Sequence, residues 1–247
     1  MDQRDARPPD APASECPLCG GTGFVVSDRE GRAVARPCRC RVEERRRLRL
    51  DSARIPPRYE HCTLESFAPT NESLQRALGF ARRVVEEFPG GEFGALFCGR
   101  AGVGKTHLAV AILREVVQQR GATGLFTEFT HLLRRIQDTY DRRSETPSWA
   151  VIQPALETDI LVLDDLGCTR TTPWVMETMG LILNERYNAK RLTLITTNRL
   201  ESPPPGEESL ADRIGERLAS RLSEMCWAVR MDGEDYRRKI KSASFFA

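Results

Sequence analysis

The chain has 247 residues and a formal net charge of +2, so it is long enough for one large domain with a small additional module. No apolar run reaches the length of a membrane span and the N-terminus lacks the apolar stretch of a signal peptide, so we expect a cytoplasmic protein without a membrane partner. Residues 29–58 contain eleven arginines and four acidic residues. This basic region predicts a polyanion or an acidic protein surface as partner, unless the arginines form only a solvated helix face.

Residues 1–14 are rich in Pro, Ala and charged side chains, which predicts a disordered tail. A cysteine cluster follows, with C-x2-C and C-x-C spacings, and consists of Cys16, Cys19, Cys38 and Cys40. Glycines after the first pair and apolar residues on both sides of Asp28–Gly31 predict a turn and a β-hairpin that bring the thiols together. The cluster favours a structural zinc site. A redox pair is the alternative, but nothing here resembles the thioredoxin surroundings of such a pair.

Residues 41–54 contain helix formers without an apolar stripe, which predicts an exposed basic helix that ends before the prolines of "IPPR". We therefore expect a zinc module with its helix at 15–54, a linker at 55–66 and a large domain at 67–247. The remaining cysteines stand singly and are expected to be small buried side chains. They are Cys62, Cys98, Cys168 and Cys226.

The strongest signal is "GRAGVGKT", which lies between a short apolar strand at 94–98 and a helix at 105–120. It satisfies G-x4-G-K-[ST], the P-loop, in which backbone N–H groups and a helix N-terminus bind phosphates. We expect Lys105 to reach the β- and γ-phosphates of ATP and the Thr106 hydroxyl to bind magnesium. The expected nucleotide loop is Gly99, Arg100, Ala101, Gly102, Val103, Gly104, Lys105 and Thr106.

Further apolar strands are expected at 124–129, in "DILVLDDLG" (159–167) and in "LTLITTN" (192–198). Ligands bind at the carboxyl ends of such strands. We expect Asp164 to hold magnesium, Asp165 to act as general base on the attacking water, and Asn198 to orient that water. Surface ion pairs and an ordinary Asn turn are the alternatives. Helices at about 105–120, 130–142, 174–189 and 210–222 complete an open α/β sheet.

The order of these motifs, with "GERLASRLSEMC" and a final "DYRRK", resembles the DnaC/DnaI-type bacterial helicase loaders, a branch of the AAA+ ATPases. The resemblance implies an AAA+ domain at 67–247 with a parallel five-stranded sheet of order 5-1-4-3-2. Too few residues follow "SRL" for a full helical lid. The resemblance also implies ATP-dependent loading of the hexameric replicative helicase onto single-stranded DNA, with the N-terminal module contacting the helicase. ATP binding and hydrolysis would act as a switch, and the short Asp165 side chain, where many AAA+ proteins have Glu, suggests slow hydrolysis.

Arginines complete the expected site. Arg213, Arg217 and Arg221 are spaced by four, so they are expected on one face of a helix. Arg221 matches the arginine finger of the loaders, with Arg217 as the fallback, which implies self-assembly through a shared ATP site. In "DYR", Arg237 is expected to sense phosphate. Contacts to the phosphates of single-stranded DNA are expected from Arg134, Arg135, Arg142 and Arg143, for which a solvated helix face is the alternative.

Two other functions stay open. An IstB-like transposition helper ATPase shares the P-loop, the aspartate strand and the "SRL" segment. A zinc-anchored nucleic-acid-binding module with a vestigial ATPase belongs to a different class. The four-cysteine module favours the loader, because partner-contacting modules of this kind are added to common folds.

Overall fold

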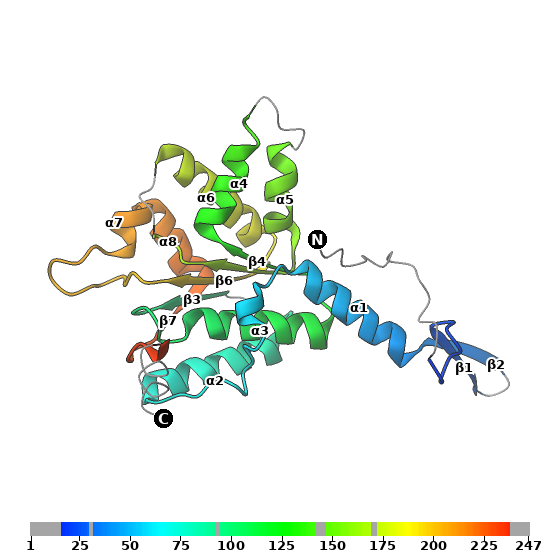
Figure 1. The fold of residues 1–247 in the computed structure, drawn as a ribbon. Coiled ribbons are helices and arrows are strands. Elements are labelled where there is room, and N and C mark those ends of the chain that lie inside the picture. Colours follow the sequence, from blue (N-terminus) through cyan, green and yellow to red (C-terminus); the bar gives the residue numbers. More distant parts are fainter. Residues whose placement is uncertain (1–15, 30–31, 92–93, 142–146, 169–171, 238–247) are drawn as a thin grey trace, which may run out of the picture. The chain divides into compact units, whose positions relative to one another are not determined.

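A computed structural model describes residues 16–29, 32–91, 94–141, 147–168 and 172–237 (Figure 1). The predicted tail at 1–14, together with Arg142 and Arg143, lies outside the described residues. The chain forms two compact units, Met1–Arg49 and Leu50–Ala247.

The first unit contains a β-hairpin and most of helix α1 (Arg39–Ser52). Strands β1 (Phe24–Arg29) and β2 (Arg32–Pro37) pair antiparallel, with Phe24 opposite Pro37 and Arg29 opposite Arg32. This register confirms the predicted hairpin. All six residues of β2 are exposed and α1 has no buried residue, which confirms the exposed basic helix.

The second unit is built on a five-stranded parallel sheet of order β4-β5-β6-β3-β7. Counted from the first strand of this sheet, that is the predicted order 5-1-4-3-2. The strands are β3 (Gly94–Cys98), β4 (Gly124–Glu128), β5 (Ile160–Asp164), β6 (Leu192–Thr197) and β7 (Cys226–Arg230). After β7 the structure describes the chain to Arg237, and these residues contain no helical lid domain.

Helices cover both faces of this sheet (Figure 1). The helices are α2 (Glu72–Glu87), α3 (Lys105–Arg120), α4 (Phe129–Asp138), α5 (Ser148–Glu157), α6 (Pro173–Asn188), α7 (Leu210–Ile214) and α8 (Glu216–Met225). One apolar cluster joins α2 and α3 to the sheet, and a second joins the sheet to α4–α8. Successive residues of β5 alternate between them: Val162 belongs to the first cluster, whereas Leu161 and Leu163 belong to the second. This two-sided burial explains why the strands are continuous apolar runs.

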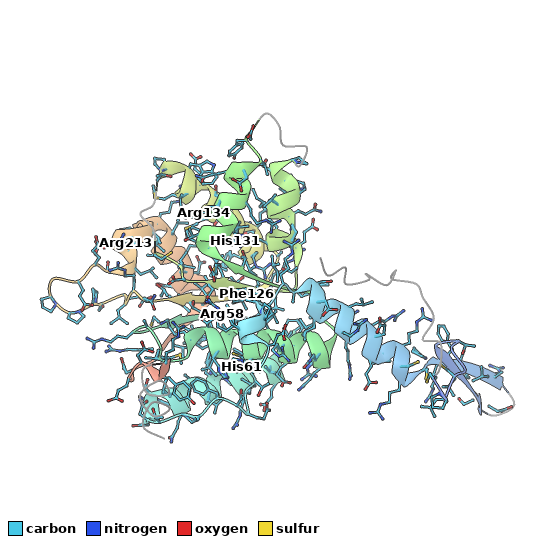
Figure 2. The ribbon with its side chains drawn as sticks, viewed as in Figure 1. Arg58, His61, Phe126, His131, Arg134 and Arg213 are labelled. Atoms are coloured by element: carbon cyan, nitrogen blue, oxygen red, sulfur yellow. The ribbon has the colours of Figure 1, made fainter. Side chains whose placement is uncertain are left out.

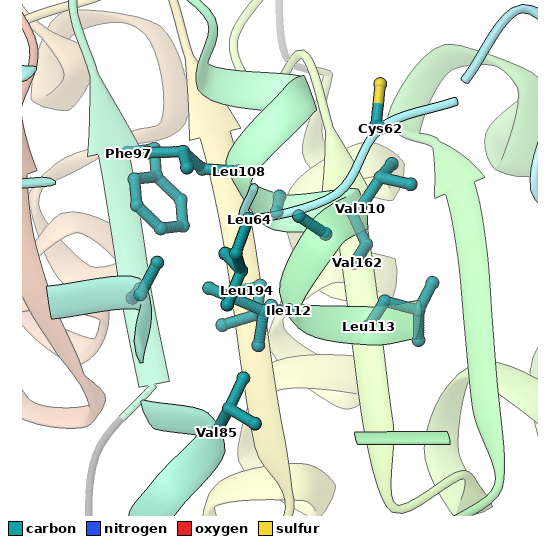
Figure 3. Close-up of a cluster of buried hydrophobic side chains, with 14 of the residues drawn as sticks. Cys62, Leu64, Val85, Phe97, Leu108, Val110, Ile112, Leu113, Val162 and Leu194 are labelled. Atoms are coloured by element: carbon teal, nitrogen blue, oxygen red, sulfur yellow. The ribbon is translucent and has the colours of Figure 1, made fainter. Parts of the chain in front are cut away.

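The cluster under α3 shows how the P-loop helix is anchored (Figure 3). Leu108 and Ile112 of α3 are fully buried and belong to one cluster with Val162 of β5 and Leu194 of β6. The segment 55–66, expected to be a linker, also contributes to this core, because Cys62 and Leu64 are buried in it. The helix that carries the nucleotide loop is therefore fixed on the sheet by apolar packing.

Some expectations are wrong in detail. Cys62, Cys98 and Cys226 are buried as predicted, but Cys168 is exposed, because it follows the end of β5 at the sheet edge. The predicted helix at 210–222 is broken at Gly215, whose φ of 85° is left-handed and ends α7. Helix α4 ends at Asp138, before the predicted position 142. No helix within the described ranges is long and apolar enough to cross a membrane.

Candidate nucleotide site and cysteine cluster

The P-loop lies between the end of β3 and the start of α3. Gly102 and Gly104 have φ values of 81° and 98°, in the left-handed region that favours glycine. A side chain at Gly102 would collide with Asp235, so the loop also needs glycine there for space. Because α3 begins directly after Gly104, the unpaired N–H groups of its first turn and its dipole favour an anion at the loop.

The amine of Lys105 is held inside the loop. It is 6% exposed and donates three hydrogen bonds of 2.8 Å, to the carbonyl oxygens of Gly99 and Arg100 and to Oδ1 of Asn198. Burial lowers the pKa of Lys105 to about 8, although the charges of Asp165 and Asp164 raise it. A buried ammonium surrounded by neutral oxygens is suited to an anionic ligand that can replace them.

Asp164 ends β5 and lies beside the first turn of α3. Its carboxylate is 4% exposed, and Oδ1 accepts a hydrogen bond of 2.8 Å from the Thr106 hydroxyl. Burial raises the pKa of Asp164, while the hydroxyl donors of Thr196 and Thr106 lower it. A carboxylate and a hydroxyl in contact are the oxygen ligands that Mg²⁺ prefers, so the residues present fit this cation.

Asp165 and Asn198 complete a connected network at the carboxyl edge of the sheet. Asn198 donates from Nδ2 to Oδ1 of Asp165 at 2.9 Å while its own Oδ1 accepts from Lys105. Asp165 has a φ of 60°, an uncommon conformation for a residue other than glycine. The structure therefore brings together Lys105, Thr106 and the residues predicted from the two apolar strands. Their roles in binding and hydrolysis stay predictions.

The other loop residues contribute through the backbone. Arg100 and Ala101 are exposed, whereas Val103 is buried in the core below the loop. The segment before Arg237 reaches the same loop, because the backbone N–H of Tyr236 donates to the Gly102 carbonyl at 3.2 Å. The charge of Arg237 adds to the dominant effect of burial in lowering the pKa of Lys105. The "DYR" segment therefore lies at the predicted site.

The predicted stripe of three arginines is wrong. Arg213 lies on α7 and pairs with Glu208, while Arg217 and Arg221 lie on α8 beyond the break at Gly215 (Figure 2 labels Arg213). Arg217 is exposed. Arg221 donates to Oε2 of Glu224 at 2.8 Å, and its guanidinium lies 4.8 Å from the ring centre of Tyr187. Only Arg217 and Arg221 remain on one helix face.

The four cysteines of the first unit meet as predicted. Their sulfur atoms all lie within 4.8 Å of one another. The closest pairs are Cys16 with Cys38 at 3.8 Å and Cys19 with Cys40 at 3.6 Å. Burial raises the pKa of both Cys19 and Cys40. A hydrogen bond from the Gly23 backbone N–H and the contact between these two thiols lower the pKa of Cys19 to about 6, while the same contact helps to raise the pKa of Cys40 to about 12. Four sulfur atoms at these separations fit zinc, which binds four thiolates in a tetrahedral site.

Sequence reasoning missed one polar residue of the nucleotide site. Thr196 of β6 is 2% exposed, and its hydroxyl donates to Oδ1 of Asp164 at 2.6 Å. Its position could have indicated this role, because Thr196 lies two residues before Asn198 in a strand that ends at the same sheet edge. Alternation along the strand points Thr196 and Asn198 to the same side, which could have indicated this contact.

Comparisons with known proteins agree with this geometry. Residues 41–244 match the family model described as "IstB-like ATP binding protein". The "Replicative helicase loader DnaC" of Escherichia coli (strain K12) is 28% identical over 193 residues, which cover 77% of this chain and 75% of that protein. The crystal structure of the DnaC helicase loader is 34% identical, with a TM-score of 0.63, and the match covers 72% of this chain and all of that one.

A structure of DnaI, 23% identical with a TM-score of 0.59, shares the fold over 74% of this chain. The family model describes an ATP-binding protein, which agrees with the P-loop at residues 99–106. The chain belongs to the family of IstB-like ATP-binding proteins, and within that family it is similar to helicase loaders of the DnaC type.

Proposed function

We propose that this chain loads a hexameric replicative helicase onto single-stranded DNA and that ATP binding and hydrolysis switch it between states. One observation carries the proposal: the P-loop, the two aspartates and Asn198 form a single hydrogen-bonded network in a chain that is similar to proteins named replicative helicase loader. Bound magnesium would supply charge neutralisation at the phosphates. Lys105 and the α3 N-terminus orient the phosphates, and Asp165 and Asn198 hold the water that attacks them.

The first unit is the part that we assign to the helicase. The exposed apolar side chains of its hairpin include Val26 and Val34, and also Phe24, whose ring lies 4.3 Å from the guanidinium of Arg41. Residues 29–49 of the same unit add nine arginines against three acidic residues. A unit that has both exposed apolar side chains and an excess of arginine fits a partner protein whose surface is acidic and carries apolar side chains.

Single-stranded DNA is assigned to the outer end of α4. Arg134 is exposed there (Figure 2), and Arg135 is half-buried. Beyond the helix, Tyr140 is 62% exposed, and its hydroxyl accepts a hydrogen bond of 3.3 Å from the indole N–H of Trp174. An exposed aromatic ring can stack on a base, and arginine can contact backbone phosphates.

The DNA assignment is tested by salt-dependent binding. The double variant Arg134→Ala/Arg135→Ala is expected to weaken affinity for an oligonucleotide without sequence preference and to reduce the salt dependence of that affinity. Tyr140→Ala is expected to weaken affinity while the salt dependence stays the same. Exposed Arg82 on α2 provides a control, Arg82→Ala. Unaltered affinity in the double variant contradicts the placement.

The ATP site is proposed to be shared between subunits. Arg221 is bound by Glu224 and stacked on Tyr187 within its own chain, and it is assigned as the finger that reaches a neighbouring γ-phosphate. Arg221→Ala is expected to bind ATP normally and to lose most turnover, by about a thousandfold if it acts as arginine fingers do elsewhere. The variant Arg217→Ala tests whether Arg217, the fallback residue, supplies the arginine finger instead of Arg221.

Mixing variants tests the sharing directly. The Lys105→Ala variant has an impaired P-loop but keeps Arg221. Its Arg221 can therefore reach the intact P-loop of a neighbouring subunit that carries Arg221→Ala. The mixture is therefore expected to recover part of the turnover. A mixture that stays inactive, with wild-type turnover independent of protein concentration, contradicts a shared site.

The loader function is tested by capture of the replicative helicase of the same cell. The tagged full chain is expected to bind the helicase and to release it in an ATP-dependent manner, and the Lys105→Ala variant is expected to bind without ATP-dependent release. A transposition helper instead assembles on duplex DNA with ATP and retains no helicase, and the family match makes this the second candidate. Nucleic-acid binding that is unchanged by Lys105→Ala, without helicase capture, favours the vestigial ATPase.

A further inference from the structure

Thr196 occupies a central place between the two aspartates of the nucleotide site. It belongs to β6, next to β5 in the sheet, and is 2% exposed. Its Oγ1 donates to Oδ1 of Asp164 at 2.6 Å and accepts from the backbone N–H of Asp165 at 2.9 Å. A hydroxyl has one hydrogen to donate, and the N–H can only donate, so the direction of both bonds is fixed.

The bond to Asp165 supports an uncommon backbone conformation. Asp165 has a φ of 60°, which a non-glycine residue keeps only when the surrounding structure holds it. Thr196 holds its N–H, and Asn198 donates to its carboxylate at 2.9 Å. Two residues of one strand end therefore fix both the backbone and the side chain of Asp165.

The bond to Asp164 limits how its carboxylate can turn. Oδ1 accepts from both Thr196 and Thr106. Thr106 comes from the phosphate loop, and its hydroxyl is expected to serve the cation. Thr196 comes from the rigid sheet and has no such second task, so it can hold the carboxylate whether or not a nucleotide is bound.

We propose that Thr196 is a positioning residue of the nucleotide site, which orients the Asp164 carboxylate for the magnesium–nucleotide complex and holds the Asp165 backbone in its left-handed conformation. This inference rests on the proposed use of ATP and magnesium. It assigns to Thr196 a role in cation affinity, separate from phosphate binding by Lys105 and the loop.

The test compares nucleotide binding with and without magnesium, using a fluorescent ADP analogue and the full chain. Thr196→Val keeps the shape and removes the hydroxyl. It is expected to raise the magnesium concentration for half-maximal binding about tenfold, the effect of losing one hydrogen bond to a charged group, with magnesium-free affinity unchanged. Thr196→Ser keeps the hydroxyl and is expected to restore the wild-type requirement.

Thr193→Val is the matched control, because Thr193 is also a buried threonine of β6 but its hydroxyl contacts Arg186. It is expected to lower the thermal midpoint and to keep the wild-type magnesium requirement. Should Thr196→Val not fold, Thr196→Ala gives the same comparison. A wild-type magnesium requirement in the hydroxyl-free variant, or a serine variant as defective as the valine one, overturns the positioning role. Absence of magnesium-dependent binding in the wild-type chain overturns the nucleotide site itself.

Discussion

The two units of this chain keep their folds by different means. In the unit Met1–Arg49, the whole of β2 is exposed and α1 buries nothing, while Cys38 is only 1% exposed. The unit Leu50–Ala247 places apolar layers on both faces of a five-stranded sheet. A small unit without an apolar core needs a metal or cross-links, whereas a large one is held by burial. Loss of a metal-binding side chain should therefore unfold the first unit alone, and loss of a buried side chain should destabilise the second unit alone.

The largest effect is expected from the cysteine cluster. Cys16→Ser removes one of four thiols within 4.8 Å of one another, and zinc binding then no longer supplies the folding energy, of order 10 kcal/mol, that the hairpin lacks. Hydrogen exchange of β1 and β2 is expected to become fast, while that of α3 stays slow. Zinc analysis is expected to fall from about one per chain towards zero.

Cys168→Ser is the control for this change, because Cys168 is exposed and lies in the second unit. It is expected to keep the zinc and the protected hairpin. A wild-type chain purified without chelators that contains no zinc would contradict the comparison, as would a hairpin that stays protected in Cys16→Ser.

A smaller effect is expected from Arg186 in the second unit. This arginine is fully buried and donates to the Thr193 hydroxyl and to four backbone carbonyls. The carbonyls belong to Ala155, Leu156, Thr158 and Leu192. Arg186→Met leaves them without this donor, which is expected to cost about 3–5 kcal/mol and lower the thermal midpoint by roughly 10 °C, measured by calorimetry.

The exposed Arg82 on α2 again serves as control, since Arg82→Met removes an arginine without burying an unpaired group. Its midpoint is expected to stay within about 2 °C of the wild type. Hydrogen exchange of β1 and β2 in the unit Met1–Arg49 should not change in either variant. An Arg186→Met variant as stable as the control would mean that apolar packing alone holds α5 and α6 on the sheet.

The same contrast explains what the sequence could predict. The P-loop, the apolar strands and the cysteine spacings are local patterns, and the hairpin and α3 follow from them. The sheet order was implied only by the resemblance to helicase loaders, and β7 was not predicted from its own residues. Helices α2 and α5 were not anticipated. The break at Gly215 depends on a left-handed φ that the arginine spacing does not reveal. Cys168 was expected to be buried because cysteine often is, but its exposure depends on where β5 ends.

The residues of the nucleotide site could be predicted more easily than the hydrogen bonds between them. Apolar residues lead into both strand ends, so Asp164 and Asn198 could be placed at one edge. The left-handed Asp165 and the bridging Thr196 depend on the register between β5 and β6, which pairs Leu163 with Ile195 and is fixed only by packing on both faces. Register of this kind is not encoded by any single segment.

The smallest effect is expected from Asp164. This buried carboxylate belongs to the nucleotide site, and its charge lowers the stability of the second unit. Burial raises the pKa of this carboxylate, so the folded state binds its proton more tightly than the unfolded chain does. Stability from such a group is present below the ordinary pKa of about 3.8 and is lost as the pH rises through the folded pKa. The ionised Asp164 carboxylate therefore lowers the stability of the nucleotide-free protein, and this loss grows as the pH rises.

Asp164→Asn removes the charge and keeps an oxygen that can accept from Thr106 and Thr196. The thermal midpoint of the nucleotide-free variant is expected to rise by at least about 2 °C at pH 7, and the gain is expected to shrink as the pH falls towards 4. Magnesium should no longer increase nucleotide affinity. Glu177→Gln, at an exposed position of α6, controls for the loss of one negative charge. A thermal midpoint below that of the control at pH 7, or a gain that does not depend on pH, would contradict this prediction. It would show that the donors around Asp164 stabilise its charge and that this charge does not lower the stability of the fold.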